Sequence, residues 1–358
     1  KSEKSDFKAI DLRCEYLENP VGLDNSNPRL FWKMDKPLRG AMQTAYQIQA
    51  ATSIYLLEKD STDLWDLGIV KSDQSIQIEY NGNKLLPGME VFWRVRIWDE
   101  NGEVSSWSKT ARWEMSILNS EDWQAKWIGA PAKMTSGDLK YASPFFRKEI
   151  KLAGKVQKAR AYVSGLGYYE LYINGSKIGD HVLSPNQTNY DRRQLEKWNE
   201  TRIGNMNTTV LYETHNITSA FKEGENTLGI ILGNGWYQQA DRPENQEYLY
   251  DSPRLIAQFE IEYENGHKET ITSDESWLTS TGPILYNGLH SGEIYDARLE
   301  QNGWSENGFD DTNWKNTELV RPPTGILKAQ TSPPDRVTKT IQPVSVSQPE
   351  KGIYRFDM

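Results

Sequence analysis

The segment Ala161–Tyr190 places the tightest limits on the fold, because apolar and polar side chains alternate along it. Within it, the run Tyr168–Ile173 puts every second side chain on the same face of an extended strand. Asn174-Gly175 follows directly, and this dipeptide favours a two-residue hairpin because both residues accept positive φ. The preceding run, Ala161–Val163, has the character of a neighbouring strand. The segment therefore predicts a twisted β-unit in the middle of a sheet.

Helical periodicity is nearly absent from the 358 residues, whereas 13 Trp, 18 Tyr, 26 Gly and 16 Pro punctuate short alternating runs. This pattern is typical of all-β multidomain proteins. The formal net charge is −9 and no Lys/Arg cluster forms a basic face, which argues against nucleic acid as a partner. No apolar run is long enough to span a bilayer. Cys14 is the one cysteine, which excludes an intramolecular disulfide and indicates a small buried residue.

Turn and linker signals predict an all-β chain of consecutive parts. Residues 1–118 hold about seven short strands and are expected to form a fibronectin type III or immunoglobulin-like sandwich. Residues 119–142 are read as a linker and first strand, and residues 143–320 as a jelly-roll-like sandwich with a polar loop insertion at 194–209. Residues 321–358 are read as a connector and the truncated start of a further β-domain, with strands at Val337–Val346 and Ile353–Phe356.

Tryptophans in the first part invite interpretation as a sugar platform, since aromatic rings stack on the apolar faces of sugars. Core packing is the better interpretation, because Trp93 shares the apolar side of the run Val91–Trp98 with Val95 and Ile97. The tryptophans expected to pack in this way are Trp65, Trp93, Trp98, Trp107 and Trp113.

The second sandwich carries long, distinctive motifs. They include YVSGLGYYELYINGSKIGDHVLSPNQTNYD from Tyr162, GENTLGIILGNGWY from Gly224, WQAKWIGAP from Trp123, SGEIYDARLE from Ser291 and FDDTNW from Phe309. Together they resemble the N-terminal β-sandwich region of bacterial α-L-rhamnosidases, closely from Trp123 to Trp314 and more loosely before that range. The ending WRVRIWDENGEVSSWS of the first part looks like a fibronectin type III domain.

The resemblance implies an inverting glycoside hydrolase that removes terminal α-L-rhamnose from glycans. Such hydrolysis needs two carboxylates flanking the scissile bond, and in the family these belong to a later helical barrel that nothing in this chain matches. The candidate acids here are read as solvated or structural: Glu170, Asp180, Asp274, Glu293 and Asp296. We therefore expect no catalytic residue in this chain and no hydrolysis by it alone. The implied partners are a rhamnose-containing glycan and the missing C-terminal catalytic barrel, and the implied location is periplasmic, secreted or surface-associated.

Two oxygen-rich loops, at residues 179–190 and 233–241, suggest that this part binds sugar. Some members of the family hold rhamnose through calcium, which prefers six to eight oxygen ligands; here Asp180 and Asn234 are the candidate calcium ligands. Asn234 lies between two glycines at a strand end, and the two aromatics that follow could stack on a deoxysugar. The candidate sugar-binding residues are Asp180, Asn186, Asn234, Trp236 and Tyr237. The competing interpretation is that GNGWY is a turn followed by a core aromatic and that Asp180 caps a turn.

Two roles stay open from the sequence. In the first, the chain is a support that docks on the catalytic barrel. In the second, it is an autonomous rhamnose-binding module. The four histidines show no metal-ligand spacing, so calcium is the one ion that the resemblance suggests.

Overall fold

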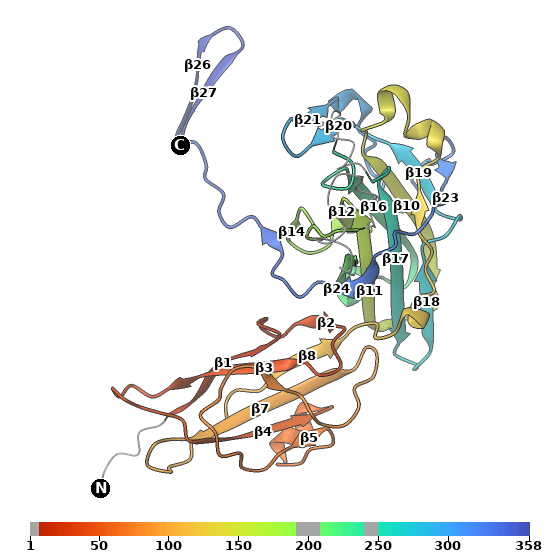
Figure 1. The fold of residues 1–358 in the computed structure, drawn as a ribbon. Coiled ribbons are helices and arrows are strands. Elements are labelled where there is room, and N and C mark those ends of the chain that lie inside the picture. Colours follow the sequence, from red (N-terminus) through yellow and green to blue (C-terminus); the bar gives the residue numbers. More distant parts are fainter. Residues whose placement is uncertain (1–6, 191–207, 240–249) are drawn as a thin grey trace, which may run out of the picture.

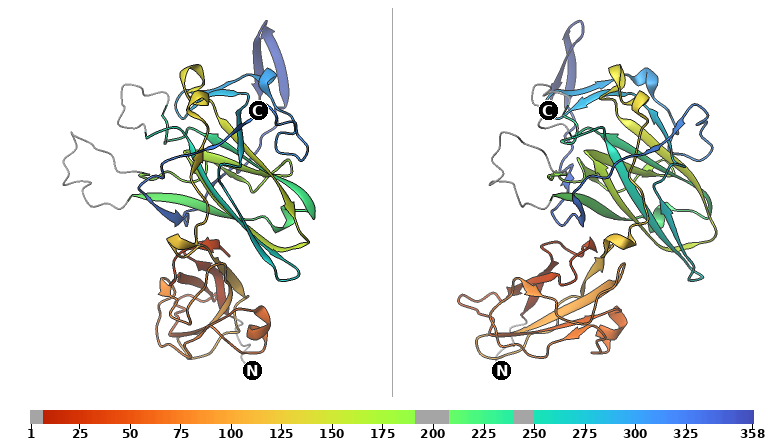
Figure 2. Two further views of the ribbon diagram at one scale, coloured as in Figure 1. Left: turned by 90° about the vertical axis from the view of Figure 1, so that its right-hand side faces the viewer. Right: turned by 45° about the vertical axis from the view of Figure 1, so that its right-hand side comes forward.

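The chain folds into two β-sandwiches joined end to end (Figures 1 and 2). The computed structural model describes residues 7–190, 208–239 and 250–358. The expected polar insertion at 194–209 lies almost wholly outside the described residues. Strands dominate both sandwiches, which confirms the all-β prediction. No helix among the described residues is long and apolar enough to cross a membrane.

The first sandwich packs a three-stranded sheet on a five-stranded sheet. The smaller sheet has the order β1 (Lys8–Cys14), β3 (Arg29–Asp35), β6 (Ile78–Glu79). The larger has the order β2 (Val21–Leu23), β8 (Ala111–Met115), β7 (Glu90–Trp98), β4 (Ala45–Ala51), β5 (Trp65–Asp66). One short helix, α1 (Ile54–Glu58), begins after Ser53, whose side chain accepts a hydrogen bond from the amide of Tyr55.

Alternation along β7 builds the core of this sandwich, as the sequence predicts. Trp93, Val95 and Ile97 are fully buried, and Trp65 and Trp113 join the same core. Core packing is wrong for Trp98 and Trp107, which are partly exposed. The Trp107 ring lies 4.2 Å from the guanidinium of Arg94 and 4.6 Å from that of Arg96. Because those arginines occupy the polar side of β7, Trp107 packs against the outer face of the sheet.

The second sandwich packs a six-stranded sheet on a seven-stranded sheet. The six-stranded sheet has the order β13 (Ser176–Lys177), β12 (Tyr168–Ile173), β16 (Gly224–Gly233), β10 (Pro144–Leu152), β19 (Leu278–Thr281), β22 (Lys315–Asn316). The other has the order β23 (Glu318–Leu319), β9 (Ile128–Gly129), β17 (Arg254–Tyr263), β11 (Val156–Leu166), β15 (Thr209–Asn216), β24 (Ile326–Ala329), with β18 (Lys268–Thr272) beside β17. Apolar side chains of both sheets meet in one core.

The remaining elements are short. Three two-stranded pairs are β14 (His181–Val182) with β25 (Asp335–Arg336), β20 (Ile284–Gly288) with β21 (Gly292–Tyr295), and β26 (Ser345–Glu350) with β27 (Ile353–Asp357). The 3-10 turns are η1 (Ser120–Asp122), η2 (Ala132–Met134), η3 (Gly137–Leu139), η4 (Thr218–Ala220) and η6 (Ala297–Leu299). The β26–β27 hairpin stands away from both sandwiches (Figures 1 and 2).

The central β-unit differs from the prediction in one respect. The Asn174-Gly175 hairpin is confirmed, and both residues have positive φ. However, β11 and β12 belong to opposite sheets, so the chain crosses the sandwich at Gly167 instead of continuing one sheet. A Cβ at Gly167 would lie 2.4 Å from the carbonyl oxygen of Asn234, so this crossing needs glycine.

Two further strand assignments need correction. The sequence patterns predict no strand at Thr209–Asn216, yet this segment is β15, because its polar side chains find buried partners from other elements. The expected strand Val337–Val346 is wrong over most of its length, since β26 begins only at Ser345. Pro343 has no amide to donate to a ladder, and Val344 is 78% exposed.

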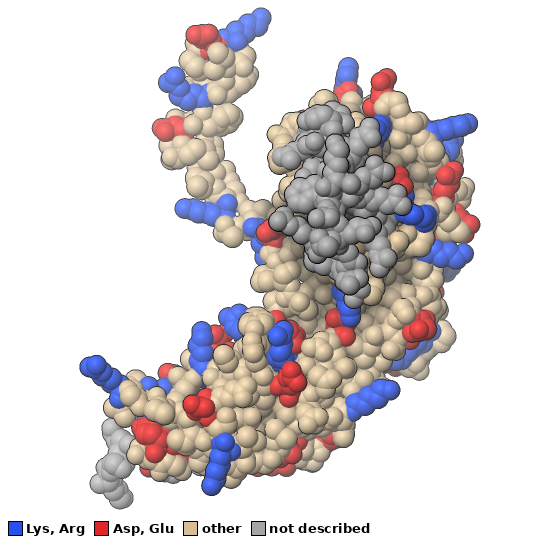
Figure 3. Space-filling model, viewed as in Figure 1, with Lys and Arg blue, Asp and Glu red and all other residues tan. Residues whose placement is uncertain are grey.

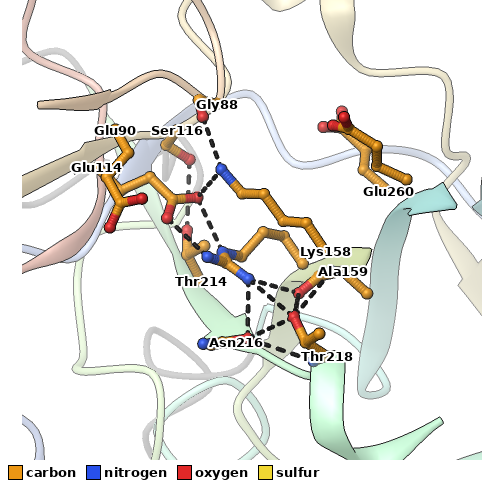
Figure 4. Close-up of polar contacts among 12 residues, drawn as sticks. Gly88, Glu90, Glu114, Ser116, Lys158, Ala159, Thr214, Asn216, Thr218 and Glu260 are labelled. Atoms are coloured by element: carbon orange, nitrogen blue, oxygen red, sulfur yellow. Dashed lines mark hydrogen bonds and ion pairs between the residues drawn. The ribbon is translucent and has the colours of Figure 1, made fainter. Parts of the chain in front are cut away.

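A buried carboxylate joins the two sandwiches (Figure 4). Glu114 of β8 accepts two hydrogen bonds from the Arg160 guanidinium of β11, at 2.8 and 2.7 Å. The Lys158 ammonium lies 3.1 Å from the same carboxylate and donates to the Gly88 carbonyl at 2.9 Å. The side chains of Glu114 and Arg160 are only 1% and 8% exposed, so this is an ion pair withdrawn from solvent.

Close backbone approach completes the contact between the sandwiches. Gly22 of β2 has φ +87°, and a Cβ there would lie 2.1 Å from Thr214 Oγ1 of β15. Ser116 Oγ accepts a hydrogen bond from the Tyr212 hydroxyl at 2.9 Å. Trp123 packs edge-on against Tyr212 at 5.1 Å, so the start of the linker is pinned at the junction.

Glu114→Gln should destabilise the junction strongly. The substitution leaves two cations without their buried partner, and breaking such a pair typically costs about 3–5 kcal/mol. We expect the free energy of unfolding to fall by about 3 kcal/mol and calorimetry to show the two sandwiches melting separately.

Glu90→Gln is the matched control. Glu90 pairs with Arg112 inside the first sandwich, and their side chains are 33% and 39% exposed. Exposed pairs contribute about 1 kcal/mol or less, so this variant should melt like the parent chain. Equal losses in the two variants would contradict a special role for Glu114.

Candidate functional site

The end of β16 holds one group of the predicted sugar-binding residues. Asn234 is fully buried. Its backbone amide donates to Asn287 Oδ1 at 2.7 Å, and its side-chain amide donates to the carbonyl oxygens of Tyr141 and Asn287 at 2.8 and 2.9 Å. These bonds tie the end of β16 to β20 and to the segment before β10. Asn234 Oδ1 has no hydrogen-bond partner in the described part of the chain.

The two aromatics after Asn234 occupy different environments. Tyr237 is 1% exposed and stacks on Tyr250 with ring centroids 5.3 Å apart, so it is a core aromatic. Trp236 is partly exposed and meets the His290 ring edge-on at 5.8 Å. Of the predicted stacking pair, Trp236 is therefore the partly exposed residue and Tyr237 the buried one.

Asp180 and Asn186 form a second group, along the connector. The exposed Asp180 carboxylate accepts a hydrogen bond from Arg336 Nε at 2.9 Å, and this bond lowers the pKa of Asp180. The backbone amide of Asn186 donates to Gln330 Oε1 at 2.7 Å, and its side chain donates to Ser332 Oγ at 2.8 Å. Both residues hold the connector in the described structure.

The proposed calcium ligands are therefore not joined by any shared contact. Asp180 contacts Arg336, whereas Asn234 contacts Tyr141 and Asn287. Within residues 7–190, 208–239 and 250–358, no group of three or more His, Cys, Asp or Glu side chains is arranged to hold a metal ion. Asp241, in the second oxygen-rich loop, lies outside the described residues. Calcium binding stays a prediction.

A buried polar network between these groups escaped the sequence reasoning. Glu213 of β15 is 5% exposed and accepts hydrogen bonds from Tyr169 at 2.9 Å and from Ser184 at 3.2 Å. His181 Nδ1 lies 2.9 Å from Glu213 Oε1, the oxygen that also accepts from Ser184. Tyr169 Oη also lies 2.6 Å from His215 Nε2. The residues of each hydrogen-bonded pair in this network are 29 to 46 positions apart in sequence, so no local motif marks the network.

The network holds Glu213 charged and His215 neutral. Burial raises the pKa of Glu213, but the contacts around it, of which the hydrogen bond from His181 is the largest, lower that pKa overall. Burial is the main cause that lowers the pKa of His215 to about 4. A neutral His215 can donate from Nε2 to Tyr169, whose own proton then goes to Glu213.

The candidate catalytic acids have structural partners. Glu170 accepts hydrogen bonds from Tyr172 and Lys177, and Asp274 from Lys148 and Ser276. Asp296 caps η6 and pairs with Arg298. Glu293 is exposed on β21. The described geometry thus gives Glu170, Asp274 and Asp296 roles in holding turns and strands.

Charge is evenly distributed on the face shown in Figure 3. Lys/Arg and Asp/Glu side chains alternate over its described residues, and neither sign forms a continuous track there. This distribution lacks the basic stripe typical of nucleic-acid-binding surfaces.

The stability of the chain should fall as pH drops below about 6.5, because of His215. Its pKa is about 4 in the folded protein against 6.5 ordinarily, so the unfolded chain takes up a proton first. The free energy of unfolding should decline by about 1.4 kcal/mol per pH unit between those values. His215→Gln should remove this slope, as measured by urea unfolding at pH 7.5, 6.5, 5.5 and 4.5.

His267→Gln serves as the control because His267 lies exposed in a hairpin turn. It should leave the slope unchanged. The interpretation of the network fails if His215→Gln retains the full pH dependence of the parent chain.

Each of the two sandwiches matches a known domain family. Residues 154–339 match the family described as the α-L-rhamnosidase N-terminal domain, and residues 9–119 match the Rha78A-like, N-terminal immunoglobulin domain. The second match agrees with the sheet pair of the first sandwich.

Full-length relatives extend well beyond this chain. An α-L-rhamnosidase of Formosa agariphila is 30% identical over 375 residues, covering 98% of this chain and 38% of the relative. One from Alteromonas sp. is 32% identical over 352 residues, covering 96% of this chain and 36% of the relative. The solved structure of the α-L-rhamnosidase from Dictyoglumus thermophilum superposes with a TM-score of 0.83 at 39% identity, over 98% of this chain and 38% of that one. With its sandwich matched over 154–339, the chain belongs to the α-L-rhamnosidase N-terminal domain family.

Proposed function

We propose that this chain is the non-catalytic N-terminal part of an α-L-rhamnosidase, which hydrolyses terminal α-L-rhamnose from glycans with inversion. The observation that carries the proposal is the family match over 154–339. The chain spans about 38% of the first relative, so the catalytic acid and base would lie in the part of the relatives that it does not cover. The structural partners of Glu170, Asp274 and Asp296 support this assignment.

The part described here would act as a support for the catalytic barrel. Two sandwiches locked by a buried ion pair make a rigid base. A connector fixed by Arg336 and Gln330 would carry the chain from this base toward the barrel in a defined direction. A parent enzyme that acts on such glycans would be periplasmic, secreted or surface-associated.

The isolated chain should not cleave an aryl α-L-rhamnoside. A protein that extends this chain to the length of the relatives should cleave it and release the β-anomer first, as an inverting enzyme does. Polarimetry or NMR detects the anomer. Cleavage by the isolated chain above the level of a heat-denatured sample would contradict the proposal.

Sugar binding by this part is the second candidate, and Trp236 favours it. A partly exposed indole offers an apolar ring of the kind that lines sugar sites together with a few polar groups. An autonomous rhamnose-binding module would hold free L-rhamnose without the barrel.

Calorimetry with L-rhamnose, with calcium or with a chelator, tests this candidate. If the site exists, Trp236→Ala should weaken binding about tenfold or more, which corresponds to about 1.4 kcal/mol. Tyr55→Ala is the control, because Tyr55 is an aromatic 57% exposed on the first sandwich. If the parent chain gives no heat of binding, sugar binding is rejected and only the support role remains.

A further inference from the structure

A residue of the immunoglobulin-like first sandwich hydrogen-bonds to the outer edge of strand β24 in the second sandwich. β24 is the last strand of the seven-stranded sheet and pairs with β15 on one side only. The Ile326 amide donates to the Thr208 carbonyl just before β15, and the Gln330 amide donates to the Tyr212 carbonyl of β15. The Ala329 amide instead donates outward, to Asp24 Oδ2 at 3.1 Å. An unpaired edge amide is a weak point of a sheet. Here the immunoglobulin-like domain supplies the missing acceptor.

Asp24 is itself held in place by the junction between the sandwiches. It follows β2, whose Gly22 packs directly against Thr214 of β15. Its side chain is 14% exposed, so its bond to the Ala329 amide is shielded from water. Charge-assisted hydrogen bonds of this kind are stronger than neutral ones. Lys328, 54% exposed and 3.6 Å from the same carboxylate, adds only a screened attraction.

Apolar packing reinforces the same point of contact. Ala329 is 5% exposed and belongs to a small buried cluster with Ile117, Tyr162 and Tyr212. Ile117 follows β8 of the first sandwich, and the two tyrosines belong to β11 and β15 of the second. β24 therefore packs where the two domains meet. A shift of one domain relative to the other would displace the side chains that contact β24.

Beyond Ala329, further side-chain contacts guide the connector. Gln330 contacts Asn186 and Glu213, at 2.7 and 3.4 Å. Arg336 of β25 donates to Asp180 and lies 3.1 Å from His181 Nε2, while β25 pairs with β14. After Arg336 the connector leaves the body of the protein, as Figure 1 shows. Its course up to that point is thus set by contacts that begin at Asp24.

We propose that the immunoglobulin-like domain steers the connector, with Asp24 as the positioning residue that fixes the outer edge of β24. The orientation of the first domain and the path of residues 326–336 are then one coupled property. This coupling is independent of the enzymatic assignment, because it concerns contacts within the chain described here.

Hydrogen exchange at the Ala329 amide, followed by NMR in the full 358-residue chain, tests the local contact. Asp24→Ala should accelerate this exchange about tenfold or more. The Gln330 amide, bonded to the Tyr212 carbonyl at 2.9 Å, is the internal reference and should change less. Lys328→Gln should leave the Ala329 rate near that of the parent. Glu18→Ala, at an exposed carboxylate of the same domain, should also have no effect.

Electron paramagnetic resonance tests the steering itself. Nitroxides at Lys59→Cys and Thr338→Cys, both exposed, report the distance between the first domain and the connector. Asp24→Ala and Glu114→Gln should each broaden the distance distribution relative to the parent. If Asp24→Ala does not fold, Asp24→Asn, which keeps an oxygen acceptor but loses the charge, should give a smaller change in the same direction.

The proposal is overturned if Asp24 variants exchange the Ala329 amide at the parent rate. It is overturned equally if exchange accelerates while the distance distribution stays narrow, because β24 would then be loosened without any effect on the path of the connector. A matching effect from Glu18→Ala would show a general loss of stability and would also reject the role of Asp24.

Discussion

The buried carboxylate of Glu114 governs how this chain is put together. A carboxylate at 1% exposure would be strongly unfavourable alone, since burial removes its hydration. The bidentate bond from Arg160 and the nearby Lys158 ammonium compensate only when the two sandwiches adopt one relative position. Apolar contact would tolerate sliding, whereas this ion pair does not. The junction therefore specifies an orientation as well as an attachment.

The same principle extends along the connector. Residues 326–336 contribute few buried apolar side chains, and Ala329 is the one apolar residue of β24 that is fully buried. Hydrogen bonds through Asp24, Gln330 and Arg336 fix the course of this segment instead. Because polar contacts are directional, they suit a segment whose task is to point the following chain toward a particular place. This agrees with a supporting role in a larger glycosidase, which remains our proposal.

Local patterns in the sequence predict the strands well where one face is buried. β12 matches its predicted limits, and the Asn174-Gly175 turn forms as expected, since period-two alternation and turn chemistry are local properties. β15 was missed because Glu213 and His215 occupy buried positions that only distant partners make acceptable. The placement of β11 and β12 in opposite sheets depends on the packing of Gly167 against Asn234, which no local pattern reveals.

The candidate site was predicted only in part for the same reason. The sequence identifies Trp236 as an aromatic beside a glycine turn, and the structure leaves it partly exposed. The sequence alone does not distinguish the buried residues Asn234 and Tyr237 from Asp180 and Asn186, whose side chains bind the connector. That division depends on Arg336 and Gln330, which are about 150 residues away along the chain.

The most direct test of the account is the distance distribution between nitroxides at Lys59→Cys on the first sandwich and Asn265→Cys on the second. Both sites are exposed, and the native Cys14 is buried and should resist labelling. The account predicts one narrow distribution that persists at 1 M salt, because the Glu114–Arg160 pair is shielded from the solvent. A broad distribution, or one that widens with salt, would show that the sandwiches move independently and would contradict the central claim.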